Sequence, residues 1–172
     1  MPKFTYVKPK NVLGLDIGAK HTGVAKVIHL SVKSGFEGAN VVLEQIEHKS
    51  TTTKLDCDRL EQVISAGVWD LIVVEDYRLY PSRVDNKGEL QNATHFKTFS
   101  RLEEVQHLGV VKYLAGKYNI PLVLQNASDV KNLKKPTFRM SGHTTGTHTR
   151  DAINHVKKHF LDSKHKGRTT KF

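Results

Sequence analysis

The sequence predicts an α/β fold in which a mixed five-stranded sheet, three antiparallel strands and then parallel strands, is flanked by helices. Three observations predict it. Short apolar runs alternate with turn residues over residues 11–46, two later apolar runs follow helix-like segments, and those segments repeat apolar residues every three or four positions. At 172 residues the chain is long enough to bury a core.

The first three strands are expected to follow one another with only short turns between them. We expect them at residues 11–17, 24–30 and 41–46. Glycine and polar residues separate them at 18–23 and 34–39. Because consecutive strands joined by short turns pair antiparallel, these three strands predict a meander.

Helices and strands alternate in the rest of the chain. Thr53 is expected to cap a helix with Asp56 in its first turn. The next strand, residues 71–75, is an unbroken β-branched run, which is typical of a strand buried on both faces in parallel pairing. The expected elements that follow are a long loop at 77–98 with a short helical piece, a helix at 99–118 ended by Asn119 and Pro121, a strand at 122–124 and a last helix containing Ala152, Ile153, Val156 and Phe160.

Composition favours a polyanionic partner. Lysine and arginine number 27 against 17 acidic residues, a formal charge of +10 with neutral histidines, and nucleic acid is the commonest partner of such a surface. No apolar stretch approaches the roughly 20 residues of a spanning helix, the first ten residues lack a secretory signal, and Cys57 is the only cysteine. We expect a cytoplasmic protein with no membrane partner, a single domain over 1–172 with a mobile basic tail at 164–172.

Four side chains are expected to converge at one edge of the sheet. Asp16 and Glu75 each end an apolar strand, and the crossover rule places these strands side by side. His148 and Asp151 are three residues apart, so both project from the first turn of the last helix. Closely spaced carboxylates repel one another, whereas Mg²⁺ accepts them as ligands and leaves room for phosphate and water. Two such ions stabilise the attacking and leaving oxygens of phosphodiester hydrolysis.

Three segments together resemble one family. They are Gly14-Leu15-Asp16-Ile17-Gly18 with Thr22-Gly23-Val24-Ala25, then Val73-Val74-Glu75, then His148-Thr149-Arg150-Asp151-Ala152. Their order and separation resemble the RuvC family of Holliday-junction resolvases, within the RNase H-like superfamily, and most of all its small phage-encoded members. The resemblance spans roughly residues 11–160. It implies a homodimeric, Mg²⁺-dependent endonuclease of DNA recombination and repair that nicks four-way junctions symmetrically, with two ions per active site and Mn²⁺ able to substitute; if phage-encoded, it acts in the host cytoplasm.

The resemblance also implies roles for individual residues. Asp16, Glu75 and Asp151 correspond to metal ligands, and His148 either binds metal or orients the attacking water. The segment that ends in Val130-Lys131 makes Lys131 a candidate contact of the scissile phosphate. The rings available to open the junction are Tyr77 and Tyr80, and basic residues without intervening acids are expected to bind DNA; these are Lys131, Lys134, Lys135, Arg139 and Arg150.

Simpler structural interpretations stand beside these roles. Asp16 could satisfy the turn beside Gly18. Only one of Glu75 and Asp76 can face the cluster because adjacent strand residues point to opposite faces, and the motif favours Glu75. Asp151 would be stabilised by the helix dipole without any function. The other histidines are expected to be solvated or structural, with His21 beside the glycine turn as the exception to consider.

Three other functions compete with the resolvase. An RNase H-like nuclease similar to the YqgF group, acting on flaps, forks or structured RNA, would lack a glutamate such as Glu75 at the end of the fourth strand. An actin-like ATPase or sugar kinase shares the Asp-Ile-Gly turn, but it needs a duplicated fold and a longer chain. A catalytically inactive protein that binds branched DNA through charge would not need the proposed ligands.

Overall fold

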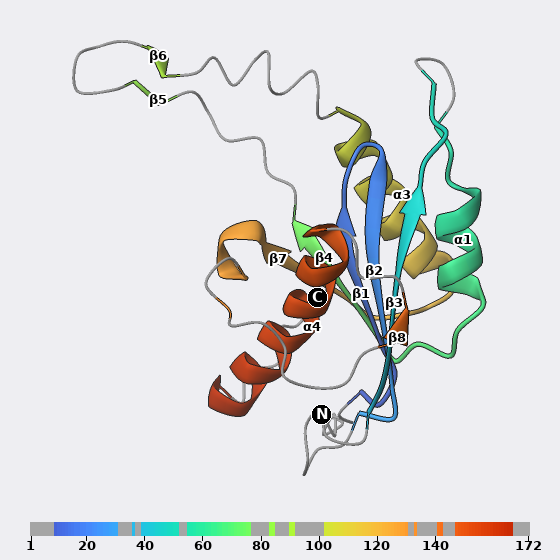
Figure 1. The fold of residues 1–172 in the computed structure, drawn as a ribbon, viewed down its shortest axis with the longest axis vertical. Coiled ribbons are helices and arrows are strands. Elements are labelled where there is room, and N and C mark those ends of the chain that lie inside the picture. Colours follow the sequence, from blue (N-terminus) through green and yellow to red (C-terminus); the bar gives the residue numbers. More distant parts are fainter. Residues whose placement is uncertain are drawn as a thin grey trace, which may run out of the picture.

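A mixed sheet lies at the centre of the structure, with its main strands in the order β7-β4-β1-β2-β3 (Figure 1). The strands are β1 Val12–Ile17, β2 His21–Ile28, β3 Asn40–Glu47, β4 Leu71–Asp76 and β7 Leu122–Asn126. The first three pair antiparallel, β4 pairs parallel with β1, and β7 pairs parallel with β4. The predicted α/β fold with a mixed five-stranded sheet is therefore confirmed.

Three two-residue strands were not predicted. β8 Ser141–Gly142 adds a sixth strand parallel to β3, and β5 Arg83–Val84 pairs with β6 Leu90–Gln91 in a separate antiparallel sheet. The computed structural model describes residues 9–30, 36, 39–51, 55–76, 83–84, 90–91, 102–130, 133, 141–142 and 147–166. In the segment where the sequence predicted a loop with a short helical piece, the four described residues form strands.

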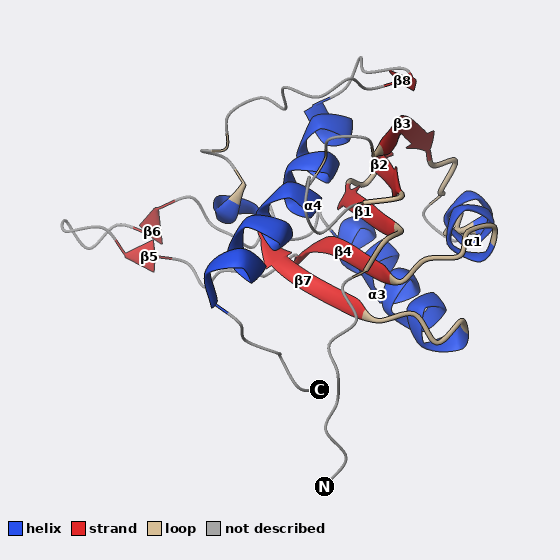
Figure 2. Ribbon diagram, turned by 90° about the horizontal axis from the view of Figure 1, so that it is seen from below, coloured by secondary structure: helices blue, strands red, loops and turns tan. Residues whose placement is uncertain are grey.

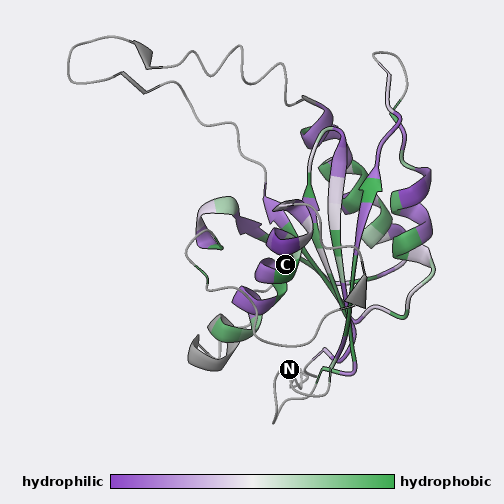
Figure 3. Ribbon diagram, in the orientation of Figure 1, coloured by the Kyte–Doolittle hydropathy of each residue, from purple (hydrophilic) through white to green (hydrophobic). Residues whose placement is uncertain are grey.

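Helices cover both faces of the sheet (Figure 2). Helix α4, Thr147–Lys166, lies on one face, and α1, Asp58–Ser65, and α3, Leu102–Lys117, lie on the other. A short 3₁₀ helix, Ala127–Asp129, follows β7. In Figure 3 the strands and the helices both carry hydrophobic and hydrophilic residues, and for the helices this is expected because each buries one side against the sheet. None of the described helices is long and apolar enough to cross a membrane.

The two faces of the sheet carry separate apolar cores because strand residues alternate. Leu13, Leu15, Val24, Ile72 and Val74 pack under α1 and α3, with Leu60, Val63, Leu108 and Val111 from the helices. Val12, Ala25, Val27, Leu71 and Val73 pack under α4, with Ala152, Ile153 and Val156. Asp16 and Glu75 continue the second series, so both belong to the face that α4 covers.

The boundaries of two helices differ in how well the sequence predicted them. Helix α1 begins at Asp58 rather than near Thr53, which lies outside the described residues. Asp56 precedes the helix because its carboxylate accepts a hydrogen bond from the Lys49 backbone N–H, at 3.0 Å. Helix α3 ends as predicted. Asn119 takes a positive φ of 54° and its N–H donates to the Gly116 carbonyl at 3.1 Å, a left-handed C-terminal cap.

Glycines let α4 lie directly on the strands. A methyl group at Gly23 would overlap the backbone carbonyl of His148, and one at Gly14 would overlap the carbonyl of Ala152. Gly23 lies inside β2, although the sequence assigned it to the turn; the strand begins at His21. The turn is shorter than predicted because Gly23 serves close helix–sheet packing rather than a change of chain direction.

Some predicted residues lie outside the described residues. They are Thr53, Tyr77, Tyr80, Lys131, Lys134, Lys135, Arg139 and the tail beyond residue 166. The DNA contacts proposed for the two tyrosines and the four basic residues among them stay predictions. Helix α4 ends at Lys166, so the first three residues of the predicted tail, 164–166, belong to the helix.

Candidate functional site

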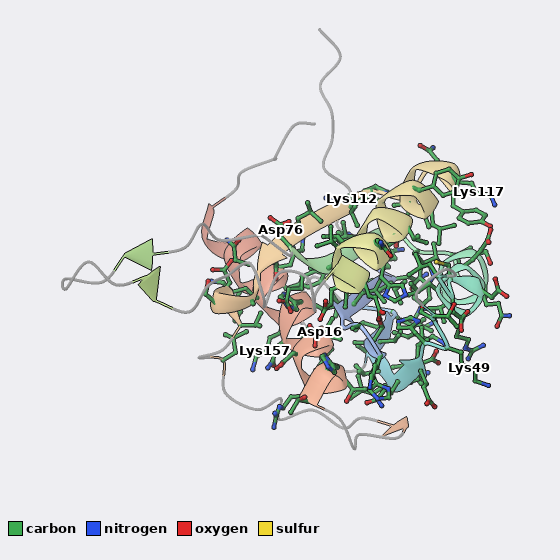
Figure 4. All side chains as sticks on the ribbon, turned by 90° about the horizontal axis from the view of Figure 1, so that it is seen from above. Asp16, Lys49, Asp76, Lys112, Lys117 and Lys157 are labelled. Atoms are coloured by element: carbon green, nitrogen blue, oxygen red, sulfur yellow. The ribbon has the colours of Figure 1, made fainter. Side chains whose placement is uncertain are left out.

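Three polar side chains lie at the carboxyl ends of neighbouring parallel strands. Asp16 is at the end of β1, Glu75 near the end of β4 and Gln125 near the end of β7. Glu75 pairs directly with Gln125 in the β4–β7 register. Strand alternation places all three on the α4 side of the sheet and turns Asp76 to the other side. Figure 4 shows Asp16 against α4 and Asp76 apart from it.

Helix α4 places three further polar residues over these strand ends. His148, Asp151 and His155 are spaced three and four residues apart, and such residues share one helical face. His155 is fully buried, His148 is 38% exposed and Asp151 is half-buried. The close contact of α4 with Gly14 and Gly23 allows the helix to approach the carboxylates.

Short distances connect the helix to the two strand acids. His148 Nδ1 donates to Asp16 Oδ2 at 2.6 Å. His155 Nε2 lies 3.7 Å from Glu75 Oε2, which is too long for a hydrogen bond. One potential ligand atom from each of Asp16, Glu75 and His155 lies within 4.8 Å of the other two. These three residues therefore surround a volume small enough for one ion.

The carboxyl group of Asp16 is held in an unfavourable environment for its charge. Only 4% of the residue is exposed. Burial raises its pKa from 3.8 to about 7, the hydrogen bond from His148 opposes this rise, and the neighbouring Glu75 adds to it. Without a cation, the Asp16–Glu75 pair therefore tends to keep a proton on Asp16 near neutral pH.

Glu75 and His148 respond to the same pair of acids. Burial would raise the pKa of Glu75, but the His155 imidazole and the proton shared with Asp16 hold it below its usual value. The hydrogen bond to Asp16 raises the pKa of His148 against the effect of partial burial, and the charges of Asp151 and Glu75 act in the same direction. The imidazoles of α4 thus offset part of the cost of burying the two carboxylates.

The arrangement fits a divalent cation. Two carboxylates and an imidazole are a common donor set for such ions. Asp16 is buried where its charge lacks full compensation, and His155 Nε2 is a buried atom with no hydrogen-bond partner in the described part of the chain. A cation between Asp16, Glu75 and His155 would satisfy all three groups.

The structure brings together some of the predicted site residues and adds His155 and Gln125 to them. Asp16 and Glu75 belong to the group of three, whereas His148 contacts Asp16 from outside it and Asp151 acts on His148 through its charge. Arg150 is exposed in the first turn of α4.

The sequence analysis did not single out His155 or Gln125; it expected the histidines outside the motif, with His21 as the exception, to be solvated or structural. The helical period contained the signal, because His155 follows Asp151 by four residues and therefore lies on the face that carries the motif. Gln125 carries no such signal, since a glutamine near the end of a short strand is common.

No protein-family model and no curated protein matches the chain. Its structure is similar to that of Thermus thermophilus RuvC, with a TM-score of 0.59 and 16% identity over 90% of this chain and 96% of RuvC.

Two further solved structures are similar. T. thermophilus RuvC in complex with a Holliday junction substrate has a TM-score of 0.55 and 17% identity, with the same coverage of 90% and 96%. The fowlpox virus resolvase in complex with Holliday junction DNA has a TM-score of 0.38 and 14% identity over 75% of this chain and 66% of that one, which is too low to support an argument. The predicted resemblance is thus confirmed in the arrangement of the elements: the chain has the RuvC fold, an RNase H-like mixed sheet flanked by helices.

Proposed function

We propose that the chain is a metal-dependent DNA endonuclease that resolves four-way junctions by nicking two strands symmetrically. The observation that carries the proposal is the meeting of Asp16 and Glu75, from adjacent parallel strands, under the histidines of α4. The fold similarity to RuvC, one structure of which contains a Holliday junction, supports the choice of substrate. The formal charge of +10 supports a nucleic-acid partner.

Within this proposal Mg²⁺, or Mn²⁺ in its place, is held by Asp16 and Glu75, with two ions in each active site. The ions supply a Lewis acid at the scissile phosphate and lower the pKa of a bound water. Asp151 completes the acidic set from α4, one residue beyond the first turn of the helix. His148 holds a proton on Nδ1 against Asp16, so it orients that carboxylate and its exposed edge faces the side from which DNA would approach.

The basic residues and aromatic rings supply DNA contacts in the same proposal. Arg150 is exposed beside His148 at the start of α4, where it can reach a phosphate. Lys131, Lys134, Lys135 and Arg139 are proposed as further phosphate contacts, and Tyr77 or Tyr80 as the ring that stacks on an unpaired base. We propose that the enzyme is of the phage type and acts in the cytoplasm, which is the host cytoplasm if a phage encodes it.

Symmetric nicking requires two active sites, so we propose a homodimer. Helix α3 offers a surface for it, since Tyr113 is 67% exposed on the side turned away from the sheet. Large aromatic residues are enriched at protein interfaces. Sedimentation at assay concentrations should give a dimer, and Tyr113→Glu should shift it toward monomer. A strictly monomeric active enzyme would contradict the dimer.

The decisive experiment compares four labelled substrates: a four-way junction, a flap, a fork and a linear duplex, each with and without Mg²⁺. Paired nicks confined to the junction would support the resolvase, whereas cutting of flaps or forks would favour another RNase H-like nuclease. Asp16→Asn should remove cleavage and leave junction binding largely intact. Asp129→Asn, an exposed acid after β7, is the matched control and should cut normally.

A further inference from the structure

His155 is a fully buried imidazole placed where the packing of α4 calls for an apolar side chain. Its neighbours on the buried face, Ala152, Ile153 and Val156, belong to the apolar core under the helix. An aliphatic residue at position 155 would pack there with no ring nitrogen to satisfy. His155 instead leaves Nε2 without a hydrogen-bond partner among the described residues, which carries a free-energy cost.

The unpaired nitrogen faces the two strand acids. His155 Nε2 lies 3.7 Å from Glu75 Oε2, and ligand atoms of His155, Glu75 and Asp16 lie within 4.8 Å of one another. Atoms of one coordination shell, each about 2.0–2.3 Å from an ion, are separated by comparable distances. The position of the nitrogen is therefore suited to an ion shared with both carboxylates.

Gln125 controls which ring nitrogen of His155 carries the proton. Its Oε1 lies 3.1 Å from His155 Nδ1, and when that oxygen accepts from Nδ1–H, Nε2 keeps a lone pair toward the acids. When the amide is turned over, its nitrogen donates to Nδ1 and to the His155 carbonyl, both at 3.1 Å, and its oxygen accepts from the His159 backbone N–H at 3.2 Å. The reversed amide leaves Nε2–H facing Glu75. The reversed amide satisfies both of its ends, whereas the other orientation sets its oxygen against the His155 carbonyl and its nitrogen against the His159 N–H. The metal-free protein therefore favours the reversed amide, and the tautomer with Nδ1–H requires the amide to turn.

We infer that His155 binds the divalent ion through Nε2, beside Asp16 and Glu75, and that this nitrogen ligand shifts the preference of the site from Mg²⁺ toward Mn²⁺. The inference rests on the proposed metal-dependent function and adds a ligand to it. Imidazole is a poorer ligand for Mg²⁺, which prefers oxygen donors, than for later divalent ions. Binding of the ion goes with the Gln125 orientation that accepts from Nδ1–H, as an outer hydrogen bond commonly sets the tautomer of a metal-bound histidine.

Metal binding measured without DNA tests the inference. We would titrate Mn²⁺ and Mg²⁺ by calorimetry into wild type, His155→Leu and His159→Leu. His155→Leu should weaken Mn²⁺ binding by roughly tenfold or more and Mg²⁺ binding less, so the ratio of the two affinities falls. His159→Leu removes an imidazole one turn later on α4, outside the cluster, and should change neither. Equal losses for both ions, or no loss, would overturn the inference.

Pulsed electron paramagnetic resonance of the Mn²⁺-loaded protein provides a second readout. Wild type should show coupling of Mn²⁺ to a ¹⁴N nucleus, and His155→Leu should lose it. Coupling that persists in His155→Leu would assign the nitrogen to His148 and refute the role of His155. Failure of Asp16→Asn to reduce binding of either ion would instead refute the proposed metal site, so the two failures are distinguishable.

Variants of Gln125 keep His155 in place, so they test the inference even if His155→Leu does not fold. Glu at position 125 can only accept from Nδ1–H, so Gln125→Glu should strengthen Mn²⁺ binding. The same substitution in a His155→Gln background separates the tautomer effect from the added charge. A gain that is as large without the imidazole would be purely electrostatic and would overturn the assignment of the tautomer.

Discussion

Replacing Asp16 with asparagine should stabilise the metal-free protein near neutral pH, although it removes a proposed metal ligand. Burial raises the pKa of Asp16 from 3.8 to about 7, so the folded state binds this proton more tightly than the unfolded chain does. The stability contributed by the proton is fully present below pH 3.8 and is lost as the pH rises through the folded value near 7. Asparagine keeps the shape of the side chain and carries no charge, so the variant has no such loss.

The expected gain can be worked out from the environment of the carboxylate. The gap between the two pKa values corresponds to roughly 4 kcal/mol in the free energy of unfolding once Asp16 is ionised. Solvent screening reduces this little, because the side chain is 6% exposed. Asparagine can still accept the hydrogen bond from His148, and the pKa of about 7 already contains the effect of that bond. We expect a gain of up to about 4 kcal/mol near pH 7.5.

Urea unfolding followed by circular dichroism, with a chelator present, measures this gain. Wild type, Asp16→Asn and the control Asp129→Asn would be compared at pH 7.5 and pH 4.5. The advantage of Asp16→Asn should shrink at the lower pH, where Asp16 of the wild type is protonated. Saturating Mn²⁺ should stabilise wild type, by about 2.7 kcal/mol at a hundredfold excess over the dissociation constant, and leave Asp16→Asn unchanged. A variant that is less stable than wild type at pH 7.5, or equally favoured at both pH values, would refute the reasoning.

Two further predictions concern a histidine on the opposite face of the sheet and a glycine beneath α4. His48 stacks on His107 with ring centroids 4.0 Å apart, and burial lowers the pKa of His48 from 6.5 to about 4. As the pH falls below 6.5, His48 of the unfolded chain takes up a proton before His48 of the folded protein does, so the free energy of unfolding decreases toward pH 4. Urea unfolding should show a loss of about 2 kcal/mol between pH 7 and pH 5. His48→Leu should not show this loss. Gly23→Ala forces a methyl group against the His148 carbonyl, so thermal unfolding should reveal a loss of roughly 1–3 kcal/mol, with impaired junction cleavage. Gly109→Ala, on the exposed side of α3 with no described atom within 4 Å of the new methyl group, should instead be neutral or stabilising.

The parts of the fold that the sequence predicted well are those set by local periodicity. Apolar runs located β1, β3 and β4, and the left-handed Asn119 ended α3 as expected. The predicted start of α1 was wrong because the Asp56 carboxylate accepts a hydrogen bond from the Lys49 backbone N–H. No local pattern in the sequence reveals this contact. β8 was missed because two residues at the edge of a sheet carry no period at all.

The candidate site also has a part that could be predicted from the sequence and a part that could not. Asp16 and Glu75 were predictable as neighbours because the ends of two parallel strands meet whenever the strands pair. The proximity of His155 to them depends on how deeply α4 sits and on its rotation about its own axis. A buried histidine within an apolar helix face is also what an ordinary core position would show, so the sequence alone did not distinguish the two.

Because α4 lies so close to the sheet, the glycines of the motif are needed to bring its acids into contact with the helix. Gly14 and Gly23 lie on neighbouring strands under the helix, and at both positions a side chain would overlap its backbone. A larger residue at either position would lift the helix by a good part of an atomic diameter. The His148–Asp16 hydrogen bond, at 2.6 Å, has no room for such a shift. The carboxylates therefore need the small residues between them to meet the helix, even though glycine contributes no chemistry of its own.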